Sequence, residues 1–158
     1  MLKRIFDIIS SLVVLTMGLP FFILIAFLIG IDSKGGVFFI QQRVGKNNRN
    51  FGLFKFRTMR SDSEKDGQIT VGGKDPRITK IGYLLRKFKL DEFPQLLNVV
   101  KGDMSIIGPR PEVRKYVNLY SQEQLTVLSF RPWLSDFASI EYINENELHK
   151  IVMYVIEE

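Results

Sequence analysis

The chain begins with a long hydrophobic stretch that follows the basic residues Lys3 and Arg4. Between Ile8 and Ile31 no side chain is charged. A helix that crosses a bilayer needs about 20 predominantly apolar residues, so this stretch is long enough to enter a membrane. A cleaved signal peptide fits less well, because its apolar region usually has about 7–15 residues and no A-x-A-like cleavage site follows. The pattern therefore predicts attachment to a membrane.

Pro20, near the middle of this stretch, leaves two membrane arrangements open. Proline lacks a backbone N–H and its ring clashes with the carbonyl of Thr16, so the helix should bend there. A plain transmembrane anchor is the default on hydropathy, since prolines also kink spanning helices. A re-entrant hairpin is the alternative, because basic clusters lie on both sides of the stretch and a spanning helix would translocate one of them.

The residues after Gly36 predict a small β-hairpin. Residues 37–60 contain two largely apolar segments joined by a turn at 45–50, where Gly and Asn tolerate positive φ. In the second segment phenylalanines alternate with Lys55 and Arg57, so one face of the strand is apolar and the other cationic. The polar, glycine-containing residues that follow predict a loop.

Helical spacing returns after this loop. The apolar positions of a predicted amphipathic helix are Ile81, Leu84, Leu85 and Phe88. Basic residues surround this stripe, so the helix either packs on a core with a solvated cationic face or lies on an anionic lipid surface. It should end before Pro94, because the residue preceding a proline avoids the α region.

Further elements complete an α+β pattern. A short helix is predicted at about 94–100, followed by Gly102. Residues 104–111 predict a short strand or turn that leads into a Gly-Pro-Arg-Pro corner. Apolar spacing predicts longer helices at 112–130 and 145–156.

Composition narrows the chemistry. The chain has 158 residues, 46% hydrophobic and 25% charged, which suits one folded domain. It contains no cysteine and a single histidine, His149, which excludes disulfides, a thiol nucleophile and Cys-based or multi-His metal sites. The formal net charge of +5 favours anionic partners. Without an RNA-binding signature, we expect phosphates and lipids rather than nucleic acid.

The adjacent acidic residues Asp91 and Glu92 are the main candidates for catalysis. Asp91 can also be read as the cap of the helix that follows, with Glu92 favourable in its first turn. Two neighbouring carboxylates suit Mg²⁺, which binds one or two carboxylates together with waters and phosphate oxygens. A carboxylate can act as a nucleophile on phosphorus where cations neutralise the phosphoryl oxygens. The candidate cations are Lys55, Arg57, Arg77, Arg86 and Arg110.

Arg110 is the most distinctive of these cations, because prolines flank it on both sides. A guanidinium on a stiff backbone loses less freedom on binding, which favours bidentate phosphate recognition. An exposed arginine in a rigid loop explains this residue equally well when it is taken alone. No Walker loop, G-x-G-x-x-G, HExxH or G-x-S-x-G motif occurs, so the common nucleotide and hydrolase signatures do not apply.

Taken in order, several segments resemble the bacterial sugar transferase family, small monotopic enzymes that move a phosphosugar from a nucleotide diphosphate sugar to polyprenyl phosphate. The matching segments are KRIFD, the proline-containing hydrophobic stretch, VFFIQQRVGKN, FKFRTM, DPRITKIGYLLRKFKLDEFPQLLNVVKGDMSIIGPRP and, more loosely, RPWLSDFASI. They extend from Lys3 to about Ile140. The ordered series is far more specific than any one of its segments.

The resemblance implies a mechanism. By that likeness Asp91 attacks the β-phosphate of a UDP-sugar, releases UMP, and passes the phosphosugar to polyprenyl (undecaprenyl) phosphate. Glu92 would assist with metal binding or proton handling, with Mg²⁺ as the cofactor. The residues that match the family's cationic positions near the phosphates are Lys55, Arg86 and Arg110.

The same resemblance implies a membrane arrangement. The family's N-terminal helix is re-entrant and broken at a proline that matches Pro20, which keeps the chain on the cytosolic face of the bacterial inner membrane. We therefore expect a re-entrant membrane helix at 1–34 and a cytosolic, membrane-associated catalytic domain at 35–158. The fold is then α+β, with amphipathic interfacial helices and the small β-hairpin.

Departures from the family pattern support an alternative. Trp133 stands where glycine is usual, and if that position has positive φ, tryptophan would strain the turn and alter a pocket near Asp136. The chain ends at Glu158 where relatives tend to continue, so we expect a shortened C-terminus. The alternative function is an inactive membrane-anchored scaffold that binds lipid or protein. The resemblance specifies neither the sugar nor the oligomeric state.

Overall fold

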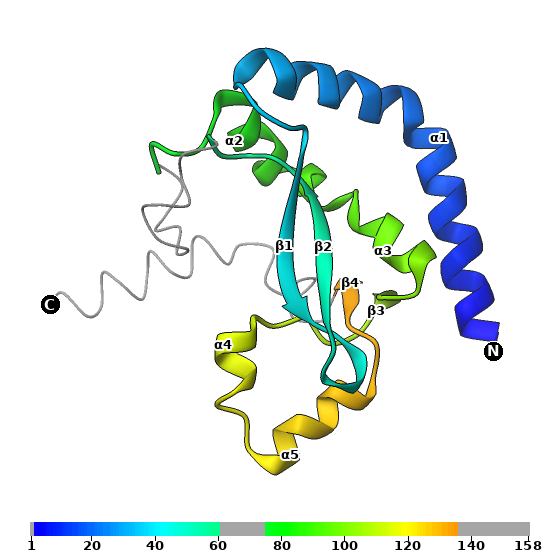
Figure 1. Ribbon diagram of the computed structural model, residues 1–158. Coiled ribbons are helices and arrows are strands. Elements are labelled where there is room, and N and C mark those ends of the chain that lie inside the picture. The colour runs from blue at the N-terminus through cyan, green and yellow to red at the C-terminus, as the bar shows by residue number, and fades with distance from the viewer. Residues whose placement is uncertain (1, 61–74, 136–158) are drawn as a thin grey trace, which may run out of the picture.

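The protein is described by a computed structural model that covers residues 2–60 and 75–135 (Figure 1). Within these residues helices combine with two two-stranded sheets, one joining β1 to β2 and one joining β3 to β4. This mixture confirms the α+β prediction. Asp136 and the helix predicted at 145–156 lie outside the described residues.

One long helix, α1, occupies Leu2–Asp32 and contains the predicted membrane segment. It is continuous through Pro20, and Figure 1 shows that its axis bends about midway. Its most apolar 18-residue window has a mean hydropathy of 2.8, so the helix is long and apolar enough to cross a membrane. The break predicted at Pro20 is thus a bend within one helix, and the re-entrant topology stays a prediction.

The predicted hairpin is confirmed. Strands β1, Phe38–Val44, and β2, Asn50–Phe56, pair antiparallel. The short 3₁₀ turn η1, Lys46–Asn48, joins them, and Asn47 and Asn48 adopt positive φ values of 56° and 60°. Asparagine tolerates this left-handed conformation better than most residues, which explains why the chain reverses here.

The predicted amphipathic helix is α2, Lys80–Lys87. Thr79 caps it, since its side-chain oxygen accepts a hydrogen bond of 2.9 Å from the backbone N–H of Gly82. Gly82 lets the helix approach the hairpin closely, because an added Cβ would collide with the backbone of Thr58. This contact sets the position of the first turn of α2 against the residues that follow β2.

A tight turn separates α2 from the next helix. Lys89 adopts φ 56°, and the 3₁₀ helix η3, Leu90–Glu92, carries the acidic pair. Helix α3, Gln95–Lys101, follows and ends at Gly102 with φ 103°, as the sequence predicts. The chain reverses twice within a few residues, so the acidic pair lies in a bend between two helices.

The single helix predicted at 112–130 is wrong. The structure instead has three short elements there: α4, Arg114–Val117; α5, Gln122–Leu125; and η4, Thr126–Ser129. The reason is local capping at Ser121, whose side chain accepts from the backbone N–H of Gln124 while the Gln124 side chain accepts from the backbone N–H of Ser121. This capping box starts a new helix inside the apolar pattern.

The second sheet joins distant parts of the chain. Strand β3, Ser105–Ile107, pairs in parallel with β4, Trp133–Ser135. Trp133 lies in extended backbone, so the strain expected from a positive φ at this position does not arise. The positive φ of 151° belongs to Gly108, where an added Cβ would collide with the Trp133 ring.

Most of the buried apolar side chains in the described part of the chain belong to two clusters around the hairpin. The first cluster contains Ile25, Ile29, Phe56 and Leu85 and joins α1, β2 and α2. The second contains Leu53, Val99 and Met104 and joins β2 to α3 and the residue before β3. Figure 1 shows the hairpin running from the C-terminal half of α1 and α2 at one end to α4 and α5 at the other.

Candidate active site

The acidic pair lies in a partly buried bend. Asp91 is only 8% exposed, and Glu92 is half-buried beside it. Pro94, and not Asp91, occupies the N-cap position of α3, and Lys89 occupies that of η3. The interpretation of Asp91 as the cap of the following helix is therefore wrong. Burying two adjacent carboxylates costs free energy unless cations lie nearby, so their surroundings decide what they do.

Two cations from distant segments reach Glu92. The Lys55 ammonium, on β2, donates a hydrogen bond of 2.9 Å to Glu92 Oε1. An Arg110 guanidinium nitrogen lies 3.9 Å from the same oxygen. Lys55 of the hairpin and Arg110 of the Gly-Pro-Arg-Pro corner thus meet at the acidic pair, and their role in phosphate binding stays a prediction.

The two carboxyls respond to this environment in opposite ways. Burial raises the pKa of Asp91, Lys55 and Arg86 oppose that rise, and the neighbouring charge of Glu92 adds to it. Burial also disfavours ionisation of Glu92, but the Lys55 charge and hydrogen bond, with Arg110 nearby, lower its pKa overall. Glu92 is therefore the stably ionised partner, and Asp91 is the carboxyl whose charge is less well compensated.

Arg86 approaches the pair from α2. Its Nε donates a hydrogen bond of 2.9 Å to Thr58 Oγ1, which fixes the guanidinium beside the end of β2. Burial lowers the pKa of Arg86, and the charge of Asp91 counters this effect. Arg86 is thus held close enough to Asp91 for their charges to interact.

Arg77 lies on the flank of this group. Its guanidinium forms an ion pair of 2.6 Å with Asp75, and the hydrogen bonds from Arg77 lower the Asp75 pKa to about 2. The charges of Arg77 and Asp75 both act on Arg86. Arg77 therefore lies next to Arg86, and no contact between Arg77 and the acidic pair is described.

Arg57 has different partners from the other candidates. It is 8% exposed, and its Nη2 donates to the Ser33 carbonyl at 2.7 Å and to Ser33 Oγ at 2.9 Å. Ser33 directly follows α1, where a positive charge is favourable at the C-terminal end of the helix. These contacts give Arg57 a structural role in joining the hairpin to α1, and its part in phosphate binding stays a prediction.

Sequence reasoning missed Arg43. This half-buried side chain on β1 donates to the Pro111 carbonyl at 3.2 Å and to Gln41 Oε1 at 2.9 Å. Burial lowers the pKa of Arg43, while Glu112 raises it and Arg110 lowers it further. Arg43 thus supports the corner that carries Arg110. Its place in the alternating strand pattern gave no sign of this contact, because the partner lies 68 residues away.

The carboxylates fit a magnesium ion that also binds substrate. No group of three or more potential ligands occurs within residues 2–60 and 75–135, so the protein offers only a partial coordination shell there. Mg²⁺ commonly uses one or two carboxylates and completes its shell with water and phosphate oxygens. Lys55 occupies one oxygen of Glu92, which leaves the other and the Asp91 carboxylate for such an ion.

The comparisons concern the whole sequence rather than single residues. Three relatives are similar over most of the chain. An Aeromonas hydrophila UDP-N-acetylgalactosamine-undecaprenyl-phosphate N-acetylgalactosaminephosphotransferase is 43% identical over 77% of this chain and 29% of its own length. An undecaprenyl-phosphate glucose phosphotransferase of Komagataeibacter xylinus is 46% identical over 69% of this chain and 21% of its own length. The exopolysaccharide production protein ExoY of Rhizobium meliloti (strain 1021) is 36% identical over 92% of this chain and 71% of its own length.

The extent of these matches defines what they show. The chain spans less than a third of the Aeromonas and Komagataeibacter proteins, so the similarity concerns one part of each. The family model described as bacterial sugar transferase, by contrast, matches residues 1–156, nearly the whole chain. The protein therefore belongs to the bacterial sugar transferase family.

Proposed function

We propose that this protein is a phosphoglycosyl transferase that moves a sugar phosphate from a UDP-sugar to undecaprenyl or a similar polyprenyl phosphate. The observation that carries the proposal is the buried Asp91, which feels the charges of Lys55 and Arg86 while Lys55 and Arg110 lie at its neighbour Glu92. Two of the similar relatives are named for transfer to undecaprenyl phosphate, and one of these names a UDP-sugar. An anionic donor and an anionic acceptor both require such a cationic site.

In the first half-reaction a carboxylate oxygen of Asp91 forms a bond to the β-phosphorus of the donor. The bond from that phosphorus to the oxygen bridging the two phosphates breaks, and this oxygen leaves with the electron pair as part of UMP. The sugar phosphate remains on Asp91 as an acyl phosphate. Burial favours this step, because bonding to phosphorus removes the carboxylate charge that the site stabilises poorly.

In the second half-reaction a phosphate oxygen of the polyprenyl phosphate attacks the same phosphorus. The bond between that phosphorus and the Asp91 oxygen breaks, which restores the carboxylate and yields a polyprenyl diphosphate sugar. One nucleophile and one set of cations therefore serve both steps, in a ping-pong sequence.

The cations stabilise the charge that develops on the phosphoryl oxygens. Lys55 and Arg110 already lie at Glu92, and Arg86 acts on Asp91 from the other side of the bend. When bound at Asp91 and Glu92, Mg²⁺ would supply further positive charge beside the phosphate oxygens. Glu92 holds Lys55 in place, and its lowered pKa keeps it ionised for that purpose.

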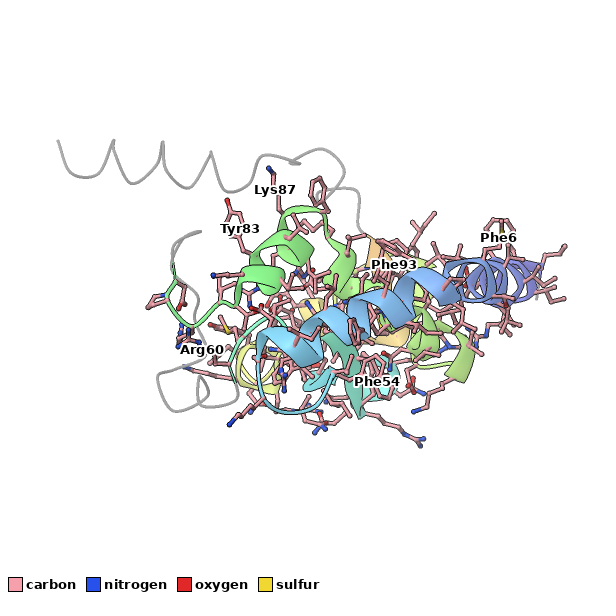
Figure 2. The ribbon with its side chains drawn as sticks, turned by 90° about the horizontal axis from the view of Figure 1, so that it is seen from above. Phe6, Phe54, Arg60, Tyr83, Lys87 and Phe93 are labelled. Carbon is pink, nitrogen blue, oxygen red and sulfur yellow. The ribbon has the colours of Figure 1, made fainter. Side chains whose placement is uncertain are left out.

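The reaction would take place at a membrane surface. Most large apolar side chains of α1 are exposed, as are the apolar residues Tyr83, Leu84 and Phe88 of α2 and its end. Figure 2 shows Tyr83 and Lys87 pointing away from the body of the protein on the same side of α2. We propose that α1 enters the cytosolic face of the inner membrane as a re-entrant helix and that α2 lies on the lipid surface.

The experiment is a donor assay that detects the covalent species directly. Purified protein in detergent, supplied with Mg²⁺ and UDP-sugars but no acceptor, should release UMP and gain the mass of one sugar phosphate. Asp91→Asn should abolish both signals, whereas Glu123→Gln, an exposed charge change on α5, should leave them intact. Adduct formation that survives Asp91→Asn would refute the nucleophile, and vesicle binding without any turnover would favour the scaffold alternative.

A further inference from the structure

Thr58 follows strand β2 closely in the chain and is only 7% exposed. Its hydroxyl oxygen accepts the hydrogen bond of 2.9 Å from Arg86 Nε, and its backbone carbonyl accepts one of 3.0 Å from the Thr79 N–H. Thr79 is the N-cap of α2, and Arg86 lies in the last turn of the same helix. One buried residue therefore contacts both ends of α2.

The spacing of residues on α2 explains this double contact. Gly82 and Arg86 are four positions apart, so they lie on the same face of the helix. At Gly82 an added Cβ would lie 2.0 Å from the Thr58 carbonyl oxygen, so only glycine lets this face come so close. The close approach at Gly82 brings Arg86, one turn further along, within reach of the Thr58 hydroxyl.

The bond to Thr58 uses only part of the Arg86 guanidinium. Arginine carries one N–H on Nε and four on its two terminal nitrogens. Thr58 accepts from Nε, and within residues 2–60 and 75–135 no acceptor forms a hydrogen bond with the terminal nitrogens. Arg86 and Asp91 interact through their charges without forming an ion pair in this part of the chain. Among the described residues, the terminal N–H groups are therefore available to a phosphoryl oxygen at Asp91.

Two carboxylates attract the same guanidinium. The charge of Asp91 favours the charged form of Arg86, and so does that of Asp75. A side chain free to rotate could therefore turn toward either carboxylate. The hydrogen bond to Thr58 restricts this rotation, because it fixes Nε beside the end of β2. A guanidinium that is already fixed also loses less conformational freedom when it binds a phosphate.

We propose that Thr58 is a positioning residue for phosphosugar transfer: its hydroxyl holds Arg86 so that the terminal nitrogens of the guanidinium bind the phosphoryl group transferred to Asp91. This inference rests on the proposed function. Donors that are fixed before the reaction stabilise developing charge without having to reorganise. Thr58 touches no reacting atom and acts through Arg86. A purely structural role, in which the hydroxyl only satisfies a buried arginine, predicts lower stability without slower transfer.

The first test compares variants of Thr58 in the donor assay, with the full chain in detergent, Mg²⁺ and a UDP-sugar. Thr58→Val removes the acceptor but keeps the shape of the side chain, so adduct formation per folded molecule should slow at least about tenfold. Thr58→Ser retains the hydroxyl and should stay within about threefold of wild type. Thr79→Val, equally buried, removes the cap of α2 and should lower the melting temperature without slowing adduct formation. Equal rate losses in the two valine variants would overturn the proposal.

A second test asks whether Thr58 acts through Arg86. Lysine has a methylene where arginine has Nε, so Arg86→Lys removes the donor but keeps the charge. In that background Thr58→Val should slow adduct formation less than about twofold, and an undiminished loss would refute the coupling. If Thr58→Val does not fold, Thr58→Cys, whose thiol is a weak acceptor, gives the same comparison in both backgrounds. A wild-type protein that forms no adduct would remove the proposed transfer and this inference with it, whereas wild-type rates in these Thr58 variants would remove only this inference.

Discussion

Among residues 2–60 and 75–135, two buried aspartates have very different settings. Asp7, on α1, is 4% exposed, and Asp91 is 8% exposed. Ser105 donates a hydrogen bond of 2.5 Å to Asp7 Oδ2, and the Lys3 ammonium lies 3.8 Å from the same oxygen. Asp91 instead interacts electrostatically with Lys55 and Arg86. Within the described residues its carboxylate accepts no hydrogen bond from another side chain.

This difference separates a carboxylate with hydrogen-bonding partners from the carboxylate that we propose as the nucleophile. Asp7 is already satisfied, so it stabilises the junction between the first turns of α1 and strand β3. Burial disfavours the charge of Asp91 although the cations Lys55 and Arg86 are near, so the proposed bond to phosphorus would relieve an unfavourable state. Burial alone therefore does not distinguish the two aspartates, and the way in which their charges are compensated does.

The largest expected effect is that of Asp91→Asn. It removes the attacking oxygen, so UMP release should fall by at least about 10³-fold. Its melting temperature should stay equal or rise, because a neutral amide is cheaper to bury than a carboxylate. Parallel assays of UMP release and thermal unfolding check both parts. A strong loss of stability would instead place Asp91 with Asp7 as a structural residue.

Lys55→Met should have the next largest effect. It leaves Glu92 without its hydrogen-bonded cation and removes a charge beside the phosphates, so turnover should fall by about 10²-fold. Lys115→Met, which changes an exposed lysine of α4, is the matched control and should retain full turnover. Equal turnover in the two variants would show that Lys55 acts only as a surface charge.

Asp7→Asn should affect stability and not chemistry. Replacing the carboxylate weakens the bonds with Ser105 and Lys3 in a buried setting, which should cost about 1–3 kcal/mol of unfolding free energy. The rate of UMP release per folded molecule should match wild type. Denaturant unfolding, with turnover normalised to folded protein, distinguishes the two effects. A lower turnover with unchanged stability would show that Asp7, like Asp91, acts in the reaction, and would contradict its structural role.

Trp133 offers a smaller test of the same junction. Its ring packs on Gly108, and the Lys3 ammonium lies 4.2 Å from its ring centroid. Trp133→Ala should therefore lose about 1–2 kcal/mol of stability through lost apolar and cation–π contact. Trp133→Phe should recover part of this loss in the same unfolding assay. A stability unchanged by the alanine variant would contradict the packing.

The smallest effect concerns an acidic side chain at the edge of the site. The Asp75 pKa falls from 3.8 to about 2 because of Arg77, so folding gains stability from this pair above pH 4. That gain should disappear as the pH falls through about 2, and Asp75→Asn should lack this part of the acid dependence. Urea unfolding of both proteins between pH 2 and pH 5 measures this pH dependence. If the unfolding free energies of the two proteins changed with pH in the same way, the Asp75–Arg77 pair would not contribute to acid stability.

Local patterns predicted most of the helices and strands. The apolar run became α1, the alternating residues became the hairpin, and Gly102 ended α3 where expected. The acidic pair and the proline-flanked Arg110 were singled out from the sequence, and the structure places Arg110 beside Glu92, while their catalytic roles stay predictions. The helix predicted at 112–130 failed because a serine capping box divides it, an effect that the apolar spacing alone does not reveal.

What the sequence determined by itself was therefore the local conformation, because periodicity, capping and turn residues act within a few positions of the chain. Tertiary structure decided the role of each polar group. It turned Arg57 toward Ser33 and Lys55 toward Glu92, although the two cations stand two residues apart. It also joined Asp7 to Ser105 across 98 residues. Such pairs depend on how distant segments pack, and no local pattern specifies that.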